Sequence, residues 1–127
     1  MIELHRDDAP QGPFISHMGE RGFCINKIWY SGGIWMTGDM ACDWLPPALE
    51  NLTLNDLQPL FDQLPHIEML LLGTGQNLIW PNGTMRRAMR DIGIGLEVMD
   101  SKAAARSWSF LRAEGRLVAA ALYPHGA

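Results

Sequence analysis

The 127-residue sequence is 47% hydrophobic and 19% charged, a composition that excludes a disordered chain and predicts a globular domain with its own core. The formal net charge of −4 at pH 7 disfavours nucleic acid and anionic membrane surfaces as partners, because the overall field repels phosphate groups. We therefore expect one domain over residues 1–127, with an ordered core over about residues 14–124 and flexible ends.

The two cysteines of the sequence indicate which metal chemistry and which cellular compartment to expect. Cys24 and Cys42 have no second cysteine and no histidine at the spacing of a metal site, so the sequence predicts no metal and no cofactor. Unpaired thiols favour a reducing, cytoplasmic location. The first residues lack the basic and apolar regions of a secretory signal, and the apolar run over 117–123 is too short to span a bilayer. We expect a soluble protein without membrane insertion, and the role of the two cysteines stays open.

The first half of the chain alternates short apolar stretches with glycine and polar turns, which is typical of an antiparallel β-meander. The Ser31-Gly32-Gly33 step is the clearest hairpin turn, since glycine accepts the positive φ that tight turns require. Pro46 and Pro47 end this half, because proline supplies no hydrogen-bond donor to a sheet. The expected strands cover residues 14–18, 22–25, 27–30, 34–36 and 40–44.

The second half alternates helical and extended patterns. Thr53 and Asp56 resemble a capping pair at the start of an amphipathic helix. The apolar stripe of that helix comprises Leu54, Leu57, Leu60, Phe61 and Leu64. Strands are expected over residues 67–72, 94–99 and 116–123, and two further helices over about residues 83–92 and 101–113.

This order of elements predicts right-handed crossovers and neighbouring parallel strands. We therefore expect an α/β fold in a single layered domain. Its mixed central sheet takes parallel strands from the C-terminal half, helices flank it, and the N-terminal half adds an antiparallel β layer. The pairing order of the strands in residues 14–44 stays open.

Two loops are candidates for a ligand site, because ligands of open α/β sheets bind beyond the carboxyl ends of parallel strands. Gly73, Thr74, Gly75 and Gln76 follow one buried strand, and Met99, Asp100 and Ser101 follow another and open a helix. Glycine permits close backbone approach, and the polar side chains supply hydrogen bonds for a small polar or anionic ligand. In the alternative interpretation the glycines only form a tight turn, and Asp100 or Ser101 only caps the helix.

Catalytic patterns are sparse. The sequence has no G-x-S-x-G elbow and no HExxH motif. Glu97 and Glu114 are candidate acid or base groups, with Arg106 and Arg116 as their available structural partners. The missing motifs favour a non-catalytic role, although an enzymatic one stays open.

A run of motifs in the second half resembles a known family. The run comprises Leu72-Gly-Thr-Gly-Gln76, Gly93-Ile-Gly-Leu-Glu-Val-Met-Asp-Ser101, Ala104-Ala-Arg106 and Glu114-Gly-Arg-Leu-Val-Ala-Ala-Ala-Leu122. In this order they are similar to the small α/β family of unknown function that includes the mitochondrial respiratory complex I assembly factor 3. The resemblance implies a compact layered α/β fold, no established catalytic activity, and protein partners. Ser101 stands where a threonine is common in that family, and Ser107-Trp108-Ser109 where Thr-Tyr-Asn is typical, so site roles of those groups would not transfer.

Two function hypotheses follow. The first is a non-catalytic protein-interaction domain, similar to an assembly factor, that recognises another protein through a sheet edge or exposed aromatic and methionine side chains and could also pair with itself. The second is a small-molecule or anion-binding domain, or a modest enzyme, that uses the 73–76 loop with Ser101, Arg106 and Glu97.

Overall fold

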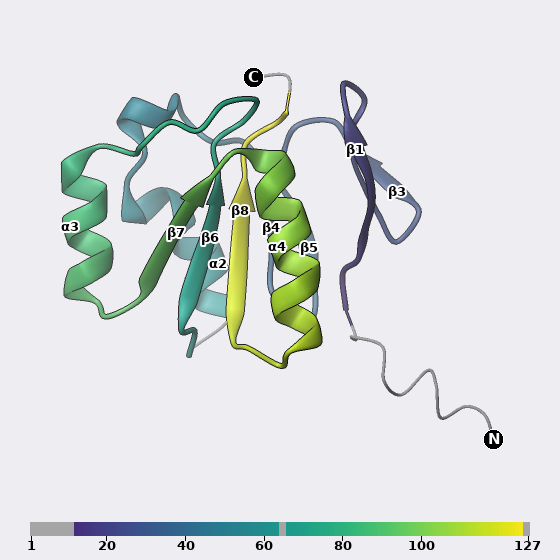
Figure 1. Ribbon diagram of the computed structural model, residues 1–127. Coiled ribbons are helices and arrows are strands. Elements are labelled where there is room, and N and C mark those ends of the chain that lie inside the picture. The colour runs from purple at the N-terminus through teal and green to yellow at the C-terminus, as the bar shows by residue number, and fades with distance from the viewer. Residues whose placement is uncertain (1–11, 64–65, 126–127) are drawn as a thin grey trace.

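The computed structural model describes residues 12–63 and 66–125, and its centre is a five-stranded mixed sheet (Figure 1). The strand order is β5–β4–β8–β6–β7. The parallel part comprises β6 (Met69–Gly73), β7 (Gly95–Met99) and β8 (Val118–Leu122), with β6 between the other two. On the other side of β8, β4 (Gly33–Met36) and β5 (Ala41–Trp44) extend the sheet in antiparallel fashion. The expected fold class and its parallel C-terminal strands are confirmed.

A separate three-stranded antiparallel sheet forms the additional β layer. It comprises β1 (Ile15–Gly19), β2 (Gly22–Ile25) and β3 (Ile28–Tyr30), with β2 in the centre. Asn26 and Lys27 form the two-residue turn between β2 and β3, and both have positive φ, 51° and 73°. Tight hairpins need positive φ at both central residues, so Lys27 belongs to a turn and not to the strand expected from residue 27.

The expectation that all five strands of the first half form one meander is wrong. β3 belongs to the small sheet and β4 to the central sheet, so Ser31 and Gly32 connect two sheets and do not close a hairpin. The reason lies in β4, whose buried side chains enter both core clusters, Trp35 on one face of the central sheet and Ile34 and Met36 on the other. A strand that is apolar at every position needs cover on both faces, and the centre of a layered sheet provides it.

Helices cover both faces of the central sheet (Figure 1). One face packs against α2 (Gln58–Gln63), α3 (Gly83–Asp91) and the short 3-10 helices η1 (Leu49–Asn51) and η2 (Leu54–Leu57). The other face packs against α4 (Ser101–Ala113) and the small sheet.

The helix expected over residues 54–64 is shorter and begins as the 3-10 helix η2. The capping pair at its start is confirmed: the Asp56 carboxylate accepts hydrogen bonds from the Thr53 amide and hydroxyl, both at 2.9 Å. Leu64 and the chain ends that were expected to be flexible lie outside the described residues.

Side-chain alternation along β6 and β8 divides the core into two clusters. Leu70 and Leu72 of β6 point to the face covered by α2 and α3, whereas Leu71 points to the face covered by α4. Trp108 of α4 is the largest fully buried side chain, and its indole donates a hydrogen bond to the Pro13 carbonyl at 3.2 Å. This residue anchors the helix between the central sheet and the N-terminal layer.

Candidate functional site

The carboxyl ends of the parallel strands meet where the sequence predicts a ligand crevice. The loops over 73–76 and 99–101 lie side by side there and are bonded to each other. The Thr74 amide donates to the Met99 carbonyl at 2.9 Å, and the Ser101 amide donates to the Gly75 carbonyl at 2.8 Å. These backbone groups already have partners within the protein.

Ser101 joins this pair of loops to the last strand. Its fully buried Oγ accepts a hydrogen bond from the Gly75 amide at 2.9 Å and donates one to the Tyr123 carbonyl at 2.7 Å. The cap of α4 is provided by Asp100, whose carboxylate accepts from the Ala103 amide at 2.9 Å. The Ser101 hydroxyl therefore binds three chain segments together and has no surface exposed to a ligand.

The two glycines of the first loop have separate structural reasons. A Cβ on Gly73 would lie 2.7 Å from Cδ2 of Leu122 and 2.9 Å from Cα of Ser101, so strand and helix approach closely only because no side chain intervenes. Gly75 has a φ of +95°, which L-residues rarely adopt. Both features support the interpretation that this loop is a tight turn.

Thr74 sets the shape of the chain that follows. Its buried hydroxyl donates to the Asn77 carbonyl at 2.6 Å and accepts from the Ile79 amide at 3.1 Å. Gln76 is the exposed side chain of the 73–76 loop. Thr74 thus shapes the segment that leads to α3.

Asn82 holds the far end of that segment. Its Oδ1 caps α3 by accepting from the Met85 amide at 2.7 Å. Its Nδ2 donates to the carbonyls of Glu50 and Leu52, each at 3.0 Å. No local pattern in the sequence indicates this role of Asn82, since the partners that its amide donates to are 30 and 32 residues away.

Between these two anchors lie three consecutive exposed apolar side chains, which we call the apolar loop surface: Leu78, Ile79 and Trp80. They are 51%, 52% and 61% exposed. The neighbouring depression, of about 460 Å³, is lined by Trp80 together with Arg86, Arg90 and residues of the β7 edge. An edge strand offers unpaired backbone groups, so apolar side chains, cations and an open sheet edge adjoin here.

The apolar loop surface was also missed by the sequence analysis. The available signal was a run of large apolar residues that fits neither a helical nor a strand period and ends at Pro81. By contrast, Trp35 of β4 and Trp44 of β5 are buried in the core.

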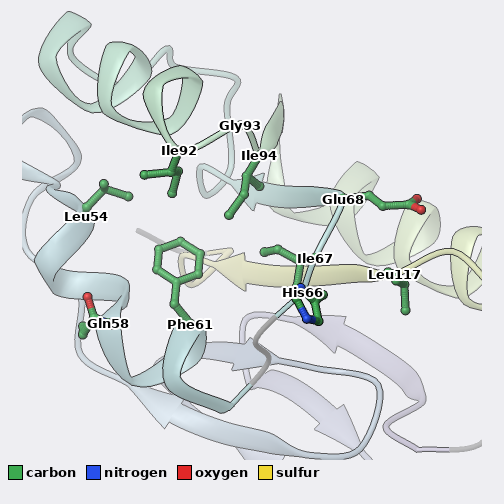
Figure 2. A pocket seen from close by; sticks show the side chains of 10 residues that line it. All are labelled: Leu54, Gln58, Phe61, His66, Ile67, Glu68, Ile92, Gly93, Ile94 and Leu117. Carbon is green, nitrogen blue, oxygen red and sulfur yellow. The ribbon is translucent and has the colours of Figure 1, made fainter.

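A second depression of about 460 Å³ opens at the opposite end of the parallel strands (Figure 2). Figure 2 shows the Phe61 ring directed into it toward Ile92, while the Glu68 carboxylate points away. Glu68 and Ile94 lie just before β6 and β7, at the amino ends where α/β sheets do not usually bind ligands. We assign this depression to the packing of α2 against the sheet.

The remaining predicted site residues are not brought together. Glu97 is exposed in the middle of β7, and Glu114 follows α4, about 20 Å along that helix from its start. Arg106 lies on the exposed side of α4 and lines a groove with β1. Arg116, considered as a partner for these glutamates, pairs with Glu68 at 3.2 Å.

Tyr123 has a shifted pKa, and its contacts indicate a structural role. Burial raises the pKa of Tyr123 to about 12, and the negative charge of Asp56 adds to the shift. The hydroxyl donates to the Pro47 carbonyl at 2.8 Å, and the ring packs edge-on against Trp44. A phenol with this pKa stays protonated at neutral pH and acts as a fixed donor.

Within residues 12–63 and 66–125, no group of three or more His, Cys, Asp or Glu side chains is placed to hold a metal ion. None of the helices in those ranges has the length and apolar character needed to cross a membrane. Cys24 lies in the small sheet and Cys42 in the central sheet, and both are free thiols.

Comparison with curated proteins finds related assembly factors. A rat protein named NADH dehydrogenase (ubiquinone) 1 alpha subcomplex assembly factor 3 is 29% identical over 123 residues, which cover 97% of this chain and 66% of the rat protein. The proteins of that name from human and Xenopus tropicalis are 30% and 33% identical, with 97% and 98% of this chain covered and 67% of each relative. The chain thus spans about two thirds of the length of these relatives.

Solved structures share the fold, and a family model identifies the family. A crystal structure of a Bordetella parapertussis protein has a TM-score of 0.81 at 29% identity, covering 90% of this chain and 97% of that one. A Bordetella pertussis protein described as a Mth938-like domain has a TM-score of 0.74 at 26% identity, covering 90% and 87% of the two chains. The family model described as "Protein of unknown function (DUF498/DUF598)" matches residues 15–123. This chain therefore belongs to the DUF498/DUF598 family of proteins of unknown function.

Proposed function

We propose that the chain is a non-catalytic protein-interaction domain that assists the assembly of a multi-subunit respiratory NADH dehydrogenase. The observation that carries the proposal is the apolar loop surface, Leu78 to Trp80, held beside an open sheet edge. Contiguous exposed apolar side chains mark protein-binding surfaces, and tryptophan and arginine are enriched at the centres of such interfaces. The names of the related assembly factors support the same role.

The construction of the loop also supports recognition of a partner. Thr74 and Asn82 fix its two ends by hydrogen bonds, so the apolar side chains are held in place before a partner arrives. Such preorganisation lowers the entropy cost of binding. The adjacent Arg86 and Arg90 favour a partner segment that carries acidic groups beside its apolar ones.

The hypothesis of a small-ligand site at the 73–76 and 99–101 loops has less support. The hydroxyls of Thr74 and Ser101, which were to contact the ligand, already bond to other parts of the chain. A thermal-shift screen with metabolites and anions tests it, since a ligand that binds only the folded state raises the melting temperature.

The assembly role is tested in the organism that supplies the chain. Its gene is deleted, and the amount of fully assembled NADH dehydrogenase in the membranes is measured by native electrophoresis and NADH oxidation. The wild-type chain should restore assembly, whereas Leu78→Ser/Trp80→Ser should not. A matched control is Leu45→Ser/Phe110→Ser, which makes similar changes at other exposed apolar positions, 92% and 64% exposed.

The outcomes separate the two parts of the proposal. Unchanged NADH dehydrogenase after deletion would reject the assembly role. Restoration by Leu78→Ser/Trp80→Ser would reject the apolar loop surface as the docking site. If the control variant also failed, the effect would not be specific to this surface.

A further inference from the structure

A second surface, distant in sequence from the apolar loop surface, lies between β1 and α4. Figure 1 shows the two elements side by side, and the groove between them has a volume of about 530 Å³. One wall is β1 over residues 15–18, and the other is α4 with Lys102, Ala105, Arg106 and Ser109. We call it the β1–α4 groove. Arg106, a site candidate in the sequence, belongs to this groove.

The β1 wall is the open edge of a strand. β1 pairs with β2 alone, so its other side has no strand neighbour among the described residues. Four consecutive residues of β1 line the groove, over a stretch where the register with β2 shifts between Ile15 and His17. Such a bulge interrupts the regular alternation of side chains. The free side of β1 offers backbone donors and acceptors that lack a neighbouring strand among the described residues.

The α4 wall is cationic. Lys102 and Arg106 are four residues apart, so both side chains leave the same side of the helix. Both residues are exposed, and neither forms an ion pair with a carboxylate anywhere in residues 12–63 or 66–125. In a chain with a net charge of −4, this is a local positive site beside an apolar floor of Ile15, Met18 and Ala105.

The spacing of the two cations fits an extended acidic segment. Four residues of helix advance about 6 Å along the axis. Two same-face residues of a β-strand, at positions i and i+2, are about 6.6 Å apart. A strand paired with the open edge of β1 can thus present alternate carboxylates to Lys102 and Arg106 across the groove.

We propose that the β1–α4 groove binds an extended acidic segment of a partner protein by strand addition to β1, with alternate carboxylates paired to Lys102 and Arg106. Main-chain hydrogen bonds supply affinity, and the two cations set the register and the preference for acidic side chains. This site is independent of the apolar loop surface, and it predicts binding whether or not the chain assists NADH dehydrogenase assembly.

The test uses the full chain and an N-acetylated, C-amidated peptide in which valine and glutamate alternate. Isothermal titration measures affinity, and amide chemical-shift changes locate the peptide. We expect shifts over residues 15–18 and 102–109, and binding that weakens as salt increases. Replacing every glutamate of the peptide with glutamine should weaken binding roughly tenfold, since two partly exposed ion pairs are lost.

Variants of the chain test the same contacts. Lys102→Gln/Arg106→Gln should reproduce the loss seen with the glutamine peptide. Lys27→Gln/Arg87→Gln, which removes two exposed cations that line neither proposed surface, is the matched control and should bind as the wild type does. Leu78→Ser/Trp80→Ser should also bind normally, which separates this inference from the proposed function.

Several results would overturn the proposal. They are an absence of binding at millimolar peptide, equal affinity for the glutamine peptide, or loss of binding in the Lys27→Gln/Arg87→Gln control variant. A version of the peptide with N-methyl groups on alternate backbone amides keeps its carboxylates but loses the N–H donors needed for strand pairing. If that peptide or free glutarate bound as well as the parent, the groove would be a simple anion site without strand addition.

Discussion

Replacing Ser101 with alanine removes a hydroxyl that joins three segments at the carboxyl end of the central sheet. The Oγ accepts from the Gly75 amide and donates to the Tyr123 carbonyl, and it is fully buried. The alanine variant leaves the Gly75 amide and the Tyr123 carbonyl without these partners at a fully buried position. The backbone conformation itself is compatible with alanine, since Ser101 is a helical residue.

The expected cost follows from the two orphaned groups. A buried polar group left without its partner costs about 1–3 kcal/mol, and alanine returns up to about 0.5 kcal/mol through its higher helix propensity. We expect the free energy of unfolding to fall by about 2–4 kcal/mol. For a domain of this size, that corresponds to a decrease in Tm of about 6–15 °C.

Urea denaturation followed by circular dichroism measures this change, and an unchanged m-value shows that the loss lies in stability. Ser109→Ala is the matched control, because it makes the same chemical change on the same helix at a half-buried serine of the groove wall. It should alter stability by less than about 0.5 kcal/mol. If the two variants were equally stable, the bridging role of Ser101 would be refuted, and its hydroxyl would be available for another function.

Three further predictions concern the same framework. Gly73→Ala should lower the free energy of unfolding by about 1–3 kcal/mol, because the new methyl group overlaps Leu122; an unchanged urea midpoint would contradict this. Asn82→Ala should lower the free energy of unfolding by about 2–3 kcal/mol, because it removes the cap of α3 and two hydrogen bonds donated by the side-chain amide. Asn82→Asp should restore only the cap, and thermal denaturation of both variants measures the difference. The folded-state pKa of Tyr123 is raised from 10.0 to about 12, so its stabilising contribution is complete below pH 10 and is lost as pH rises through about 12. The loss should amount to about 2–3 kcal/mol and be absent in Tyr123→Phe; a parallel decline of both proteins over that range would refute the assignment.

The proposed surfaces differ in what they demand of a partner. The apolar loop surface offers fixed side chains and favours a complementary apolar patch. The β1–α4 groove offers backbone pairing and two cations and favours an extended acidic segment. A single partner could engage both surfaces only by spanning α4 and the central sheet, since the two lie on different elements.

Patterns that repeat over short distances were readable from the sequence. The apolar stripe of α3, the unbroken run that became β6, and the caps formed by Asp56 and Asp100 depend on neighbours within a few residues. These fixed the α/β class and placed the 73–76 loop beside the start of α4, because parallel strands bring their carboxyl ends to one edge.

Other features of the fold and the site depend on contacts between residues far apart in the chain, so only the tertiary structure decided them. β4 left the expected meander because it needed β8 as a neighbour, some 85 residues later. Ser101 changed from a candidate ligand contact to an internal bridge because Gly75 and Tyr123 meet it there, and Arg106 acquired β1 as its neighbour across the fold. Local propensity determines which segments become helix or strand, but burial and exposure are set by contacts between segments, and these determined which surfaces stayed open to partners.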